Sequence, residues 1–140
     1  MKKCSALLTV TILICVCAAQ AQERQMLKVA VPFSFTAENT NFPAGTVTVY
    51  LLNPFNLVRV QSSDGHHVAI IRGLPVQKSA EQKESALVFD RIAGQFFLAQ
   101  VRERDNDIRR ELPLGSSARE LTARNHNGQQ VASMITIPAR

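Results

Sequence analysis

The sequence predicts a mainly β fold: an antiparallel meander of seven or eight strands, with one short helix near the C-terminus. Several short segments alternate apolar and polar residues, which is typical of strands with one face in the core. Turns rich in Pro, Gly and Asn separate these segments at short intervals. The meander favours a small barrel, because closure would cover the edge strands, and a two-sheet sandwich is the alternative.

The first residues predict a secretory signal peptide. Lys2 and Lys3 give it a charged start, and an uncharged apolar run follows at Ser5–Ala19. This run is shorter than the roughly 20 residues that cross a bilayer as a helix. Small residues then provide a cleavage site ending at Ala21. We expect cleavage after Ala21, with cleavage after Ala19 and a retained anchor as the alternatives.

After a leader of residues 1–21, residues 22–140 are expected to form a single β-rich domain. This domain has 14 Lys and Arg against 11 Asp and Glu. The small excess favours solubility and weak attraction to an anionic envelope polymer, and there is no basic stripe of the kind that binds nucleic acid. The mature chain is predicted to lack disulfides and thiol sites, because the leader holds every cysteine: Cys4, Cys15 and Cys17.

The leader also predicts where the protein works. We expect export to the periplasm or to the outside of the cell. Once the leader is removed, the remaining sequence offers no apolar run long enough for a stable membrane span.

The segment Ala86–Val101 predicts a hairpin at the centre of the fold. Large apolar residues occupy adjacent positions in both of its arms, so both faces of the hairpin should be covered. A strand with one wet face would alternate instead. The turn between the arms is expected at Ile92-Ala93-Gly94.

The other strands follow from alternation and from the turns between them. Leu27–Phe35 should be an edge strand, or one bent at a bulge, because Pro32 cannot donate a ladder hydrogen bond. Turns are expected at Glu38–Gly45, Asn53–Asn56 and Ser62–Gly65, the last with an Asp-Gly step. The remaining expected strands are Thr46–Leu52, Leu57–Gln61, His67–Arg72 and Val131–Ile137.

One long connection and one helix complete the expected chain. Leu74–Glu84 is predicted to be a surface loop, with a gate over a binding cleft as the functional alternative. Ser117 and Glu120 match a capping box, which predicts a helix from Ala118 to about Asn125. Asn127-Gly128 should stop this helix.

Four motifs occur in a suggestive order: Val31–Phe35 (VPFSF), Phe42–Thr46 (FPAGT), Phe89 with Phe96–Leu98, and Glu111–Pro113 (ELP). They resemble a group of small exported bacterial proteins of unknown function, built around VPFxF, LPAGxYxV, FxxxxxxYFL and ELPxS. The resemblance covers about Val29 to Ala123 and implies export and a β-rich domain. Phe42, Thr46 and Phe96 depart from the usual Leu, acidic residue and Tyr. The resemblance implies no catalytic or binding residue.

The histidines do not predict a metal site. His66 and His67 are adjacent and would point to opposite faces of a strand, and His126 has no ligand spacing to either. Asp64 and His66 could join a serine in a triad, but the chain has no G-x-S-x-G motif. The serines before the predicted helix are explained by capping. We therefore interpret these residues as parts of turns.

Two pairs of carboxylates lie in charged segments: Glu81 with Glu84, and Asp105 with Asp107 in an expected turn. Neither pair has apolar surroundings that would raise a pKa. The second pair also lacks the Gly and the distal Glu of a calcium loop. We predict no catalytic, cofactor-binding or metal-ligating residue, and no cofactor.

Two further groups could serve binding. Phe42 and Phe55 sit in expected turns, where an aromatic either plugs the end of the fold or, if exposed, makes a sticky surface. Cross-strand ion pairs or binding of a polyanion would explain four arginines that alternate with acidic residues: Arg102, Arg104, Arg109 and Arg110.

Taken together, these patterns predict an exported, non-enzymatic β-domain. Its expected role is a binding module for a small apolar ligand or an envelope component. The alternative is a structural or adhesive surface subunit that associates through an edge strand such as Leu27–Phe35. The fold class alone does not separate these functions.

Overall fold

The computed structural model describes residues 23–53, 55–77, 84–104, 108–125 and 133–139 of the chain. The expected leader, the expected turn at Asp105–Asp107 and the expected helix stop at Asn127-Gly128 lie outside these residues. Glu81 and His126 lie outside them too.

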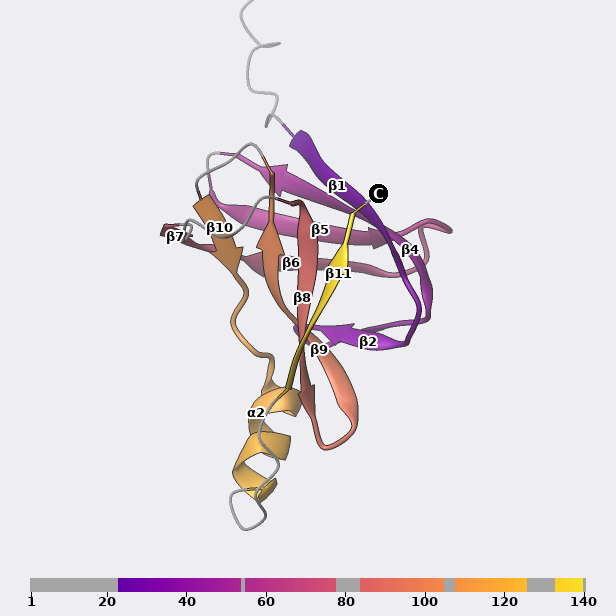
Figure 1. The fold of residues 1–140 in the computed structure, drawn as a ribbon, viewed down its shortest axis with the longest axis vertical. Helices are drawn as coiled ribbons and strands as arrows, with labels where there is room; N and C mark the ends of the chain where they lie inside the picture. The colour runs from indigo at the N-terminus through magenta and orange to yellow at the C-terminus, as the bar shows by residue number, and fades with distance from the viewer. Residues whose placement is uncertain (1–22, 54, 78–83, 105–107, 126–132, 140) are drawn as a thin grey trace, which may run out of the picture.

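Two β-sheets pack against each other, and a single helix lies beyond the second sheet in the described part of the chain (Figure 1). The first sheet has four strands in the order β1-β4-β5-β6. The second has seven, with the path β11-β8-β9-β10-β7 and the pair β2-β3 beside β9. The elements are β1 (Glu23–Val31), β2 (Phe35–Ala37), β3 (Thr40–Phe42), β4 (Gly45–Leu52), β5 (Leu57–Ser62), β6 (Val68–Arg72), β7 (Leu74–Gln77), β8 (Ala86–Ile92), β9 (Gln95–Arg102), β10 (Ile108–Glu111), α2 (Ser116–Arg124) and β11 (Ser133–Pro138).

The mainly β class and the late helix are confirmed, and the chain adopts the two-sheet alternative because its sheets do not close into a barrel. The expected meander is interrupted where the chain changes sheets. Pro32–Ser34 carries it from β1 in the first sheet to β2 in the second, and β2 runs parallel to β9 through Thr36 and Phe97. Gly73 carries it from β6 to β7.

The two sheets remain open along one side, where their outer strands β1 and β11 lie next to each other. These two strands do not pair with each other over their described residues. Pro32 directly follows β1, and Pro138 is the last residue of β11. Because proline has no N–H, each strand edge ends at a residue that cannot extend a ladder.

The core lies between the sheets and follows the expected alternation. In β1, Leu27, Val29 and Val31 are buried, whereas Lys28 and Ala30 between them are exposed. The same pattern repeats on β4, β5 and β6. The largest fully buried side chains are Phe42, Phe89, Ile71, Leu87, Leu98, Val29, Val31, Val47, Val49, Val58, Val60 and Val88.

The β8-β9 hairpin is covered on both faces, as its sequence predicts. Leu87, Phe89 and Leu98 belong to the core shared with the first sheet. On the opposite face, Phe97 packs with Ala118 of α2. Four consecutive residues of β8, Ala86–Phe89, are buried, which explains why this segment shows no alternation.

Four short strands were not expected. Leu27–Phe35 breaks at Pro32, so its last residue begins β2, and the expected turn Glu38–Gly45 contains β3. The expected long loop from Leu74 begins with β7, and β10 pairs with it in the charged segment. Such strands of three or four residues are too short for a period of two to stand out. Tertiary pairing, not local pattern, forms them.

The capping box is wrong. The helix begins at Ser116 after an N-cap Gly115, and no side chain of the N-cap residue bonds the first turn. Instead Asn39, in the β2-β3 turn, accepts hydrogen bonds at Oδ1 from the backbone N–H of Ser116 at 3.0 Å and from its hydroxyl at 2.9 Å. The capping group therefore comes from a residue distant in sequence, and Ser117 lies within the helix.

The β8-β9 turn places Ala93 at φ 51° and Gly94 at φ 78°, so both central residues have positive φ. This is the turn type in which Asn-Gly is preferred, and an alanine there is strained. Ala93→Asn should raise the free energy of unfolding by about 1 kcal/mol in urea titration. Ala30→Asn, on an extended strand, should give no gain; an equal gain in both would refute the turn explanation.

Candidate functional site

The residues considered for a triad meet in the β5-β6 turn. The Asp64 carboxylate accepts hydrogen bonds from the Ser62 hydroxyl and from the backbone N–H of His66, the latter at 2.9 Å. These bonds, the Ser62 hydroxyl first, lower the pKa of Asp64. His66 thus contributes its backbone to this contact, and the arrangement stabilises a hairpin turn.

His67 serves the same turn. Its backbone N–H donates to Ser62 Oγ at 3.0 Å, and its ring lies 5.9 Å from that of Phe42. The expected strand from His67 begins one residue later, at Val68. Among the described residues, no three His, Cys, Asp or Glu side chains gather in a way that could hold a metal ion.

The four arginines do not form one surface. Arg110 is only 6% exposed, and Arg109 pairs with Glu111 on its own strand at 3.2 Å. Glu103 instead pairs with Arg24 of β1 through two contacts of 2.6 and 2.9 Å. The expected cross-strand pairing is therefore replaced by pairs along β10 and with β1, and Arg110 cannot act as a surface contact for a polymer.

The two turn aromatics differ. Phe42 lies in β3, is 1% exposed and stacks on Phe35 with 5.0 Å between the ring centroids. Phe55 is 66% exposed. Phe42 therefore belongs to the core, and Phe55 is a surface residue.

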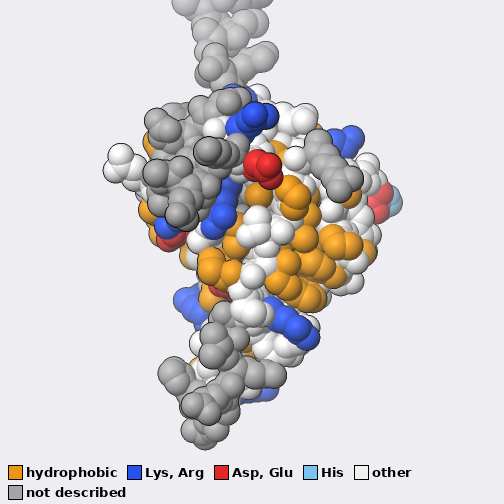
Figure 2. All heavy atoms as spheres, in the orientation of Figure 1, with side chains coloured by type: hydrophobic (Ala, Val, Ile, Leu, Met, Phe, Trp, Pro, Cys, Tyr) orange, Lys and Arg blue, Asp and Glu red, His pale blue; other side chains and the backbone are white. Residues whose placement is uncertain are grey.

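A groove lies where the sheets fail to close. Two hollows of about 470 and 640 Å³ run along β1, and they share Lys28 and Pro138. We call them together the seam. Figure 2 shows hydrophobic side chains gathered on this face of the molecule, from the region of β11 and β1 down to that of β2. The seam is lined by Gln25, Met26, Leu27, Lys28, Val29, Ala30, Pro32, Thr46, Glu84, Ser85, Arg104, Ile137, Pro138 and Ala139.

Side chains that pack against the main core reach the surface along the seam and also beside β2. Five partly buried apolar residues pack against this core in the described part of the chain. Met26, Ile137 and Ala139 line the seam itself. Phe33 and Phe96 stack with 4.1 Å between ring centroids and line an adjoining hollow of about 420 Å³ beside β2.

One bank of the seam is the free edge of β1, whose strand partner in the sheet is β4. The other bank is β11 with the residues before β8. There Ser85 accepts a hydrogen bond from the backbone N–H of Ala139 at 2.9 Å, and its hydroxyl accepts one from the N–H of Arg104 at 2.9 Å. This second bank is therefore fixed by backbone pairing.

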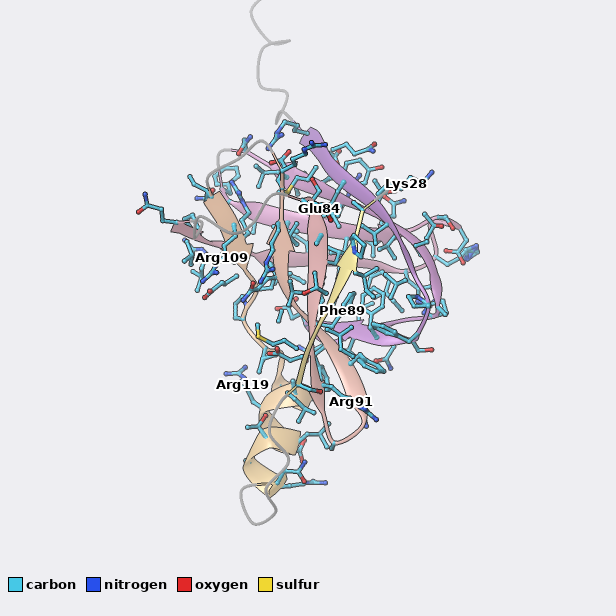
Figure 3. The ribbon with its side chains drawn as sticks, viewed as in Figure 1. Lys28, Glu84, Phe89, Arg91, Arg109 and Arg119 are labelled. Atoms are coloured by element: carbon cyan, nitrogen blue, oxygen red, sulfur yellow. The ribbon has the colours of Figure 1, made fainter. Side chains whose placement is uncertain are left out.

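Charges stand at the rim of the seam. Figure 3 shows Lys28 on β1 and Glu84 before β8, with the C-terminal end of β11 between them in that view. Lys28 is exposed and makes no ion pair with any described residue. The rim thus offers a cation on the β1 side of a groove whose apolar lining is concentrated in the smaller hollow.

Sequence reasoning predicted the edge strand but not the groove. Alternation and Pro32 marked the first bank. The second bank depends on β11 lying near β1, more than 100 residues later in the chain. The one available signal was Pro138, which stands at the end of an alternating segment, as Pro32 does.

Comparisons with family models, with curated proteins and with solved structures give no match to this chain. No helix in the described part of the chain is long and apolar enough to cross a membrane.

Proposed function

We propose that this protein is an exported, non-enzymatic binding module and that the seam is its binding site. The ligand would be a small apolar molecule or an apolar part of an envelope component. The observation that carries this proposal is the run of partly buried core residues along the seam, Met26, Ile137 and Ala139. Concave, mostly apolar sites with a few polar groups at the rim are typical of ligand binding.

The seam is a better site than the space between the sheets. That space holds fully buried side chains such as Phe89, Ile71 and Leu98, so it is filled by the protein itself. The export part of the proposal rests on the leader, with Lys2, Lys3 and the apolar run after them.

A structural or adhesive subunit is the second candidate, and the free edge of β1 favours it. An unpaired strand edge presents backbone donors and acceptors with which a strand of a second chain can form hydrogen bonds. In that case the ligand of the seam would be another copy of this chain.

Native mass spectrometry of the protein, isolated from its own host without denaturation, tests the proposal. We expect a defined extra mass on the monomer. Ala30→Trp, which places a large ring at the seam, should remove that mass, and the matched variant Ile70→Trp on the exposed face of β6 should keep it.

Two other results of the mass measurement would speak against a small bound ligand. A bare monomer for the unmodified protein would contradict the proposed binding module. Dimers or chains that grow with concentration and vanish in Ala30→Trp would support the second candidate instead.

A further inference from the structure

We infer that the seam takes an extended polypeptide segment, which adds to the first sheet as a strand beside β1. This inference rests on the proposed function and names its ligand class. The segment would carry apolar side chains toward the floor of the seam and an acidic side chain near Lys28. Addition of a strand to a free sheet edge is an established mode of peptide recognition.

The free edge of β1 is the first argument. β1 pairs with β4 on one side only. The backbone N–H and C=O of every second residue therefore point to the other side, toward the seam. A purely apolar ligand in the seam would shield these groups from water without bonding them, which is unfavourable. A peptide backbone bonds them and still leaves its side chains free to cover the apolar floor.

The length of the regular edge is the second argument. The pairing of β1 with β4 shifts register between Gln25 and Leu27, and Pro32 follows the strand at its other end. The regular window is therefore Leu27–Val31, five residues that span about 17 Å. A bulge and a proline at the two ends limit uncontrolled extension of the sheet, while the window between them stays open.

Charge is the third argument. Lys28 lies at the rim inside this window, and it has no ion-pair partner among the described residues. An acidic residue on the added strand would face it. A second copy of β1 is a poorer fit, because antiparallel pairing over the same window brings the two Lys28 side chains into diagonal proximity.

The probe is a nine-residue peptide, acetylated and amidated, with valine at even positions, threonine at odd positions and glutamate at the centre. Its valines share one face and its glutamate lies on the other. We expect saturable binding to the full chain as its host processes it. Amide hydrogen exchange should slow within Leu27–Val31 and stay unchanged in β6.

Two N-methylated peptides separate strand pairing from apolar contact. One is methylated at even positions and the other at odd positions, and all side chains are kept. Because alternate N–H groups point to opposite edges of a strand, one peptide should lose about ten-fold or more in affinity and the other should change little. Equal affinity of both would overturn strand addition and leave the proposed binding module standing.

A charge swap tests the role of Lys28. Lys28→Glu should weaken binding of the glutamate peptide by a few-fold and favour the same peptide with a central lysine, as expected for an exposed ion pair. Arg72→Glu makes the same charge change on β6 and should have no such effect. If Lys28→Glu still preferred the glutamate peptide to the lysine peptide, the acidic residue proposed opposite Lys28 would be wrong.

Two further outcomes would identify a different occupant of the seam. Suppose that neither the glutamate peptide nor the central-lysine peptide binds at millimolar concentration, while a small molecule is found on the isolated protein. The inference of a peptide ligand then fails and the proposed function stands. If the peptide is excluded because the chain dimerises through Leu27–Val31, the occupant is a second copy.

Discussion

Gly115→Ala should lower the free energy of unfolding by about 3 kcal/mol, measured by urea or thermal titration. A Cβ at this position would lie 1.9 Å from the carbonyl oxygen of Glu38 and 2.7 Å from Asn39 Oδ1. The first contact is with backbone, so no side-chain rotation relieves it. The β2-β3 turn and the start of α2 must separate, and the contact of the helix with Phe97 loosens with them.

Two variants show whether the contact or the helix itself is responsible. Asn39→Ala removes the cap at Ser116 and should cost about 1 kcal/mol. Ser117→Ala should be close to neutral, because Ser117 lies inside the helix and caps nothing. The account would be contradicted if Ser117→Ala cost as much as Asn39→Ala, or if Gly115→Ala left stability unchanged.

Arg110→Met should raise the free energy of unfolding by about 2 kcal/mol, although it removes a charged residue from the fold. Arg110 is 6% exposed, and its Nε and Nη1 find no hydrogen-bond partner among the residues that the structure describes. Desolvation lowers the pKa of Arg110, with Glu103 opposing this and Arg24 adding to it. Replacing such a buried cation by an apolar side chain of similar length is often stabilising.

Arg24→Met gives the contrast for this prediction. Arg24 holds Glu103 through two contacts, and the Glu103 side chain is only 13% exposed. Removing its partner should lower stability by about 1 kcal/mol, since the Arg24 side chain is half exposed. A loss of stability in Arg110→Met as well would mean that the buried guanidinium is satisfied, and would refute the explanation.

The sequence predicted the parts of the fold that follow from local pattern. The alternation in Leu27–Val31 and the continuous apolar arms of Ala86–Val101 both describe burial correctly, because each reflects how many faces of a strand are covered. Turn chemistry predicted the turns at Ser62–Gly65 and Ile92–Gly94, and in the structure Gly65 and Gly94 have positive φ there.

The failures have a common cause in contacts between distant residues. The helix is capped by Asn39, so the local Ser-x-x-Glu pattern gave the wrong N-terminus. The barrel was favoured because closure would cover the edge strands. The open side is instead managed by Pro32, Pro138 and a bulge near Met26. Both prolines are visible in the sequence, but the bulge and the closeness of β11 to β1 come from contacts between distant residues.

The sequence predicted one side of the candidate site, the β1 edge, but not the other, for the same reason. The edge strand that forms one bank was expected from alternation and Pro32. The apolar floor needs Ile137 and Ala139 against Met26, a combination that no spacing rule connects.

Amide hydrogen exchange of β1 shows whether a ligand occupies the seam when the protein is in its host. The protein is compared as isolated from its own host and again after unfolding and refolding have stripped any ligand. We expect slow exchange at alternate amides of Leu27–Val31 in the isolated protein, faster exchange after stripping, and no change in β6. Identical exchange of Leu27–Val31 in the two samples would contradict this expectation.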